Sequence, residues 1–264
     1  MAFKDIQREL YNGAVKLTYR NRSHKYYVNN ELKQGVTTVL GSVLAKPGLM
    51  TWPLDLAIKY LQERLPVVTQ EDLDEARKQH TKRRDSGANT GSIVHELAEK
   101  ILNGENPSLD GYDFEVKLAI GSFQEWFSAS KPEVIAVEQI IYSRNHDYAG
   151  TFDSILRLNG KNYLCDLKTT NASREAPKGV YNEYFVQLGA YLEAYEEQRQ
   201  YEEENGGTKL VKIDDVMIIS CKKNGVVDTV TGTEVGVTVD KCRSMWVDIL
   251  KLYRQLKEIA NNLK

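Results

Sequence analysis

Two aspartates and a lysine on neighbouring predicted strands are the residues of this chain whose types and spacing best suit chemistry. Residues 148–158 and 161–168 are rich in β-branched and aromatic side chains, and Asn159-Gly160 between them is typical of a two-residue hairpin turn. Such a turn pairs the last residue of the first strand with the first residue of the second. Counting back from that pair predicts that Asp153 lies directly opposite Asp166.

The opposed aspartates predict a cation site. Directly opposed residues share one face of a sheet, with Cβ atoms about 4.5–5.5 Å apart. Two ionised carboxylates at that distance repel each other unless a cation lies between them, and oxygen ligands suit Mg²⁺ or Mn²⁺. Lys168 lies two residues beyond Asp166, so its ammonium group faces the same side.

The alternative is a pair of solvated acids on an exposed face. This alternative fits poorly, because the residues next to Asp166 are apolar on both faces of the strand, as in a buried strand: Tyr163, Leu164, Cys165 and Leu167. A buried pair of acids needs a partner.

His95 is the candidate third ligand. It lies beside the apolar stripe of a helix predicted after Gly91, and Glu99 follows one helical turn later, so the two side chains emerge together. A histidine in such a place is often purely structural, and that alternative stays open.

The surrounding sequence predicts one α/β domain in which strands hold these residues and helices cover them. No linker rich in Gly, Ser or Pro divides the chain. The periodicity predicts short strands within 15–39, a helical region over 49–102 that Pro66 interrupts, helices over 114–128, 182–204 and 242–263, and strands over 134–143, 216–221 and 233–239.

Charge and cysteine usage narrow the function classes. The 264 residues include 35 lysines and arginines against 37 aspartates and glutamates, a net charge of −2, so any contact with nucleic acid needs a local basic patch. The densest basic run is Arg77–Arg84, for which a solvated helix face is the simplest interpretation.

Three widely spaced cysteines favour a reducing compartment, and the first ten residues do not have the pattern of a secretory or mitochondrial leader. We therefore expect a cytoplasmic protein.

Four motifs in order resemble the PD-(D/E)XK nuclease superfamily, and within it the RecB-like branch, which includes phage exonucleases and the mitochondrial genome maintenance exonuclease. The motifs are Gly91-Ser-Ile-Val-His95, Gly150-Thr-Phe-Asp153, Asp166-Leu-Lys168 and Gln187-Leu-Gly-Ala-Tyr191. Each is weak alone, but the ordered set is specific. Stretches at 24–28, 36–40 and 49–52 extend the resemblance over most of the chain. It implies a restriction-endonuclease-like core with a central mixed β-sheet flanked by helices, plus an N-terminal β-hairpin region and a helical arch insertion.

The resemblance also implies roles for individual residues. The metal ligands it implies are His95, Asp153, Asp166 and the backbone carbonyl of Leu167, with Lys168 beside the attacking water. It implies that Glu138 is a further catalytic acid, for which the alternative is an ordinary acid at a strand edge. The implied DNA contacts come from Gln187, Tyr191, Thr169 and Ser92, although the apolar stripe of its helix leaves Tyr191 a core position as the alternative.

We expect a single nuclease domain over 1–264, with an N-terminal β region over 1–45, a helical arch over 46–90 and the nuclease core over 91–264. On the arch, Arg83 and Arg84 would contact phosphates and Trp52 would stack on a base.

The expected function is a Mg²⁺- or Mn²⁺-dependent DNA exonuclease that acts on single-stranded ends in recombination, repair or phage DNA processing. Its candidate partners are phage or host recombination and replication proteins, in a bacterial or phage-infected cell and without a membrane. Two alternatives stay open: a structure-specific endonuclease with the same core, and a non-catalytic DNA-binding accessory protein. Some members of the branch hold an iron–sulfur cluster on four cysteines. This chain has three, so we expect no cluster.

Overall fold

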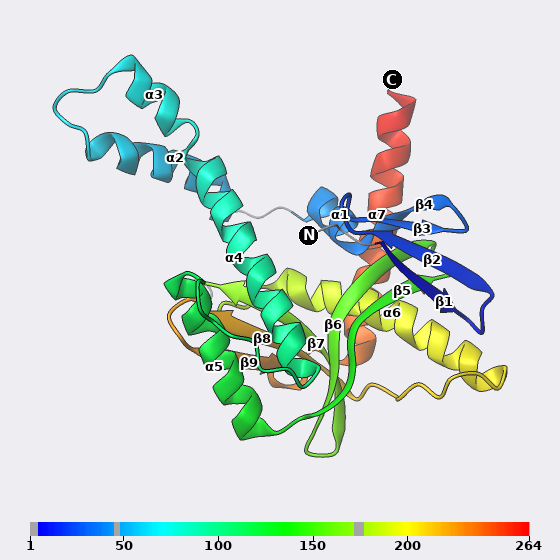
Figure 1. Cartoon of the computed structure of the whole chain (residues 1–264). Helices are drawn as coiled ribbons and strands as arrows, with labels where there is room; N and C mark the ends of the chain where they lie inside the picture. The colour runs from blue at the N-terminus through cyan, green and yellow to red at the C-terminus, as the bar shows by residue number, and fades with distance from the viewer. Residues whose placement is uncertain (1–4, 45–47, 172–176, 264) are drawn as a thin grey trace.

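The core of the molecule is a large mixed β-sheet (Figure 1). The computed structural model describes residues 5–44, 48–171 and 177–263. Nine strands in these ranges form the sheet in the order β1-β2-β3-β4-β6-β7-β8-β9, with β5 paired to β6. The strands are β1 (Ile6–Leu10), β2 (Val15–Arg20), β3 (Lys25–Val28), β4 (Glu31–Gly35), β5 (Glu133–Ser143), β6 (Tyr148–Leu158), β7 (Lys161–Thr170), β8 (Asp215–Lys222) and β9 (Val227–Thr231).

Helices cover both faces of the sheet. They are α1 (Val36–Val43), α2 (Gly48–Gln62), α3 (Gln70–Ala76), α4 (Gln79–Leu102), α5 (Phe114–Ser130), α6 (Asn182–Glu204) and α7 (Val239–Asn262), with a 3₁₀ turn η1 (Thr233–Val235). Strand β7 shows the two layers, because its side chains alternate between them. Leu164 packs with α6 and α7, whereas Cys165 and Leu167 pack with α4 and α5.

Strand β6 changes partners along its length, and this creates the opening in which the candidate site lies. Its first two residues pair with β4 in parallel, at Tyr148 and Ala149. Its last five residues, from Ser154 to Leu158, pair with β7. Between these two stretches, residues 150–153 lie beside β5 on one edge of β6. On the opposite edge of β6, no strand of the described residues pairs with these four.

Helices α2 and α3 and the first half of α4 form an arm that stands away from the sheet (Figure 1). Helix α2 contacts α3 and α4 and makes few contacts elsewhere. No helix in the described ranges has the length and apolar character needed to cross a membrane.

The predicted α/β fold, a central mixed sheet flanked by helices, is confirmed. The hairpin register is confirmed for five pairs, from Ser154–Cys165 to Leu158–Lys161. The ladder stops at Ser154–Cys165, so the predicted Asp153–Asp166 pair is not formed. Helix α6 has the predicted ends, and β6 does too.

Three predicted elements are wrong. Residues 36–39 form the start of α1 and not a strand, because Val36, Val39 and Leu40 have helical spacing and are all buried. Residues 233–239 form the 3₁₀ turn and the start of α7, and the last strand lies earlier, at β9; Gly236 follows the turn with a φ of 67°, in the left-handed region that glycine favours.

The third error concerns α4. It begins at Gln79 and passes through Gly91 without a break, although that glycine was expected to precede the helix. The expected boundary between arch and core at residues 90 and 91 therefore lies inside one continuous helix. Strand β1 lies within the expected N-terminal β region but was not predicted as a separate strand. Residues 45–47, which span the expected boundary between that region and the arch, lie outside the described ranges.

Candidate functional site

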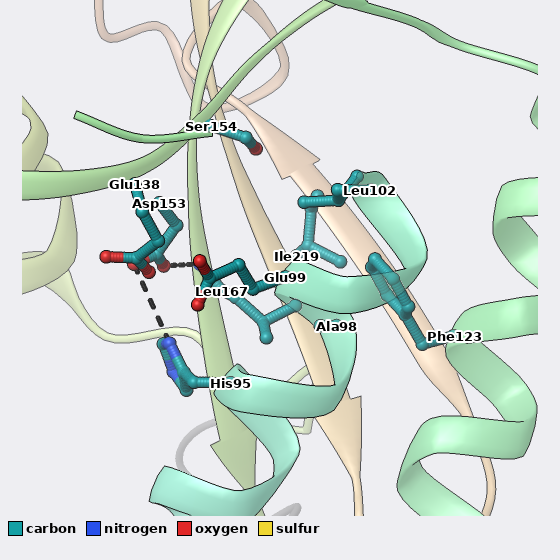
Figure 2. A pocket seen from close by; sticks show the side chains of 10 residues that line it. All are labelled: His95, Ala98, Glu99, Leu102, Phe123, Glu138, Asp153, Ser154, Leu167 and Ile219. Carbon is teal, nitrogen blue, oxygen red and sulfur yellow. Dashed lines mark hydrogen bonds and ion pairs between the residues drawn. The ribbon is translucent and has the colours of Figure 1, made fainter. Parts of the chain in front are cut away.

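Three ligand-type side chains meet where β6 lacks its second neighbour. His95 comes from α4, Glu138 from β5 and Asp153 from β6, and Figure 2 shows them pointing toward one another. One nitrogen or oxygen of each lies within 4.8 Å of those of the other two. His95 Nδ1 is 3.6 Å from Asp153 Oδ1. The three side chains are half-buried.

Glu138 has a strained backbone. Its φ is 47°, in the left-handed region, although it lies in the middle of β5. Such a conformation costs on the order of 1–3 kcal/mol for a residue that is not glycine and is found mainly at functional sites. Because Val137 pairs with Ser154 and Gln139 with Phe152, Glu138 lies across from Asp153. The strained residue is therefore itself a member of the cluster.

The Asp153 side chain bonds to the backbone of β7 where the β6–β7 ladder has stopped. The β6–β7 ladder ends at Ser154–Cys165, one step before the predicted Asp153–Asp166 pair. There the Leu167 N–H donates a hydrogen bond of 2.5 Å to Asp153 Oδ2. This bond fixes the carboxylate and leaves Oδ1 directed at His95.

Asp166 belongs to a second, connected set of contacts on the α6 face. It is 2% exposed, and its Oδ2 lies 2.6 Å from Lys168 Nζ. Lys168 also donates a hydrogen bond of 3.2 Å to Gln187 Oε1, and Gln187 Nε2 donates one of 2.7 Å to the Tyr191 hydroxyl. The D-x-K strand and the Q-x-x-x-Y helix are thus joined by one chain of polar contacts.

Gly150 leaves space for the ring of Tyr191, the last residue in this series of polar contacts. A Cβ atom at this position would lie 2.8 Å from Tyr191 Cε1 and 2.9 Å from Val36 Cγ2. Any larger residue would push the Tyr191 ring away, so the glycine of the G-x-x-D motif has a packing reason.

Burial and mutual repulsion shift the pKa values in the cluster. Burial, helped by the charge of Asp153, raises the pKa of Glu138 to about 8. Burial also raises the pKa of Asp166, although Lys168 opposes it. For Asp153, burial is outweighed by the charges of His95 and Lys168, and the pKa is lowered. Burial acts against the charged form of His95, but Asp153 outweighs it and raises the pKa of that imidazole. Burial therefore disfavours the ionised forms of Glu138 and Asp166, and a bound cation would stabilise ionised carboxylates here.

The donor set fits a divalent cation. One imidazole nitrogen and two carboxylates converge, and carboxylates are the ligands that Mg²⁺ and Mn²⁺ prefer. Of the predicted ligands, His95 and Asp153 are in this cluster, whereas Asp166 contacts Lys168 and lies outside it. Glu138, predicted as an additional acid, is the third member.

The predicted DNA contacts are spread over the molecule. Ser92 is exposed on α4, one turn before His95, and its hydroxyl donates to the Ala88 carbonyl. The Thr169 hydroxyl oxygen is buried, with no hydrogen-bond partner among the described residues. Gln187 is half-buried beside Lys168, whereas Tyr191 is 3% exposed. At this burial the Tyr191 ring is a core side chain, the alternative that the apolar stripe of its helix left open.

The remaining predicted contacts lie on the arm. Trp52 is half-buried on α2, and Arg83 and Arg84 are exposed on α4. Arg84 lies 3.0 Å from Asp85, its sequence neighbour. The structure does not bring these three residues to the metal-type cluster.

Sequence reasoning missed the role of Tyr184. The motifs single out Gln187 and Tyr191 on this helix but not Tyr184, whose ring centroid lies 4.9 Å from Lys168 Nζ. The available signal was position: Tyr184 precedes Gln187 by three residues and so shares its helix face.

Comparison with known proteins agrees with this geometry. A family model described as the PD-(D/E)XK nuclease superfamily matches residues 113–260, which include Glu138, Asp153, Asp166, Lys168 and the Q-x-x-x-Y helix but not His95. The search of curated proteins gave no match. The family match covers more than half of the chain and includes the strands and the helix that build the site. The chain belongs to the PD-(D/E)XK nuclease superfamily.

Proposed function

We propose that the protein is a metal-dependent DNA exonuclease that hydrolyses phosphodiester bonds at single-stranded ends. Membership of the superfamily supports a metal-dependent nuclease. The observation that carries the proposal is the meeting of two sets of groups at one opening in the sheet: a cation-type cluster of His95, Glu138 and Asp153, and the ammonium group of Lys168 held by Asp166.

The cluster would hold the cation through His95, Glu138 and Asp153. A bound divalent cation would polarise the scissile phosphate and lower the pKa of a bound water. The Leu167 N–H holds the Asp153 carboxylate in place before any ligand binds. Asp166 contributes negative charge on the other side of the strand, and we propose it as a further ligand when DNA is bound.

Lys168 is the proposed partner of the attacking water. Three groups fix its ammonium: the Asp166 carboxylate, the Gln187 amide oxygen and the Tyr184 ring. A fixed positive charge at this position would orient the water and offset the negative charge that develops on the phosphate. Gln187 and Tyr191 hold the lysine and are positioning residues in this proposal.

The arm supports a single-stranded substrate. It carries exposed Arg83 and Arg84 on α4 and the indole of Trp52 on α2, and basic and aromatic side chains together are what proteins use to bind single strands. Arg84 precedes His95 by eleven residues on α4, which is about 17 Å along the helix axis. A strand lying along α4 could reach both.

Digestion of a labelled linear single strand beside a covalently closed circle of the same composition tests this proposal. We expect Mg²⁺ or Mn²⁺ to support loss of the linear strand only, and EDTA to stop it. Cutting of the circle would show an endonuclease instead. Binding without cutting, in every metal, would show an accessory protein.

A further inference from the structure

A groove lies next to the candidate active site, on the α6 face of the sheet. It has a volume of about 540 Å³, within the range of roughly 300–1,000 Å³ that is usual for small-ligand sites. We infer that it binds a nucleotide of the same DNA strand whose scissile phosphate lies at Lys168. This inference rests on the proposed function and adds a subsite to it.

Two tyrosines connect the groove to the catalytic lysine. Tyr181 lines the groove and is 37% exposed. Its ring meets the ring of Tyr184 edge to face, with centroids 5.6 Å apart. The Tyr184 ring in turn lies 4.9 Å from Lys168 Nζ. An exposed aromatic ring one side chain away from a bound phosphate is in place to stack on the neighbouring base.

The lining of the groove suits both the apolar faces and the negative charge of a nucleotide. Phe185, Val230 and Met245 are among its apolar walls, which suit the faces of a base and a sugar. Its charged side chains are Lys178 and Lys241, and no carboxylate from the described residues lines it. Apolar walls with two cations and no anion favour a ligand that is flat, partly apolar and negatively charged, and a nucleotide in a strand meets all three conditions.

The position of the groove follows from the fold. The segment 177–181, the start of α6, β9, the residues at and after η1 and the start of α7 form it. Several of its apolar members belong to the core between α6 and α7. Packing in that core holds the walls Phe185, Val230 and Met245, whereas Tyr181 is exposed at the edge of the groove.

The first test measures affinity for a single-stranded oligonucleotide in EDTA, so that no strand is cut. Stacking of one base on an aromatic ring is worth about fivefold to 150-fold in affinity, and Tyr181→Ala should weaken binding by at least about fivefold. Tyr181→Phe keeps the ring and should bind as the unchanged protein does. The double variant Lys178→Ala/Lys241→Ala should reduce the slope of log K against log salt by about 1.4, because each phosphate contact on a single strand contributes about 0.7.

A matched control uses Lys209→Ala/Lys212→Ala, which removes two exposed lysines in the segment between α6 and β8, away from this groove. This variant should keep the slope. Equal slopes for both double variants, or unchanged affinity in Tyr181→Ala, would overturn the inference while leaving cleavage by the unchanged protein intact. Failure of the unchanged protein to bind or cut DNA would overturn both the inference and the proposed function.

The second test maps the contact directly. A photoreactive 5-iododeoxyuridine is placed at successive positions of the oligonucleotide and crosslinked in the complex. Crosslinks to Tyr181 from one or two adjacent positions, lost in Tyr181→Ala, are expected. Crosslinks confined to the arm would overturn the groove as a nucleotide subsite.

Discussion

The hydroxyl of Tyr191 is the point at which the chain of polar contacts behind Lys168, the proposed partner of the attacking water, can be broken with the smallest change. Tyr191→Phe removes one oxygen atom that accepts a hydrogen bond of 2.7 Å from Gln187 Nε2. The same glutamine accepts the hydrogen bond from Lys168. The substitution leaves the ring, and therefore its packing against Gly150, in place.

The expected magnitudes follow from these contacts. An unsatisfied buried donor costs about 1–3 kcal/mol, and because Gln187 is only half-buried we expect about 1–1.5 kcal/mol of stability to be lost. In a chain of this size that lowers the Tm by a few degrees, about 2–4 °C for each kcal/mol. A Gln187 side chain that can turn holds Lys168 less well, and we expect the cleavage rate to fall about tenfold, equivalent to about 1.4 kcal/mol in the barrier.

Tyr195→Phe is the matched control. Tyr195 lies one turn further along α6, and its hydroxyl donates a hydrogen bond of 2.9 Å to the Val211 carbonyl, away from Lys168. Both variants should lose similar stability in urea unfolding, but only Tyr191→Phe should lose rate in a single-turnover cleavage assay. Equal rates in the two variants, at equal stability, would refute the positioning role and leave Tyr191 a core residue only.

Three further predictions concern other parts of the site. Gly150→Ala should cost about 1–3 kcal/mol of stability by overpacking, measured in urea, and should also slow cleavage because the new methyl group displaces Tyr191. In the metal-free protein the raised pKa of Glu138 means that its ionisation opposes folding, so the Tm should fall as pH rises from 4.5 toward about 8. Glu138→Gln should flatten that profile, and a metal-induced rise in Tm that is unchanged in this variant would contradict a ligand role. Arg83→Ala/Arg84→Ala should weaken DNA binding and its salt dependence, measured by anisotropy, whereas unchanged values would rule the arm out as a DNA contact.

Local chemistry explains why the sequence predicts the hairpin so well. Asn159 has a φ of 50° and Gly160 a φ of 78°, the left-handed pair that a tight two-residue turn requires. That turn sets the register of β6 and β7, and the register brings Asp153 next to the D-x-K strand. Helix α6 also begins and ends where the local sequence pattern predicts it.

The parts that the sequence does not predict depend on contacts between distant segments. The break in the β6–β7 ladder needs β4 to take over one end of β6, and no local pattern near Asp153 shows this. Glu138 enters the cluster because its backbone is left-handed, which a β-branched strand pattern does not suggest. Tyr191 is buried because its ring packs at Gly150, on another element, within the core cluster that also contains Val36. Residues 36–39 were predicted as a strand because β-branched residues outweigh helical spacing in so short a segment.

Cleavage of a linear single strand by the unchanged protein and by Asp153→Asn, with and without Mg²⁺ or Mn²⁺, tests the central claim most directly. Asp153 lies in the cation-type cluster and is hydrogen-bonded to the D-x-K strand, and Asn retains its shape. The account predicts metal-dependent cleavage by the unchanged protein, and a loss of at least a hundredfold in the folded variant, about 2.7 kcal/mol or more. Cleavage without metal, or an active Asp153→Asn variant, would contradict it.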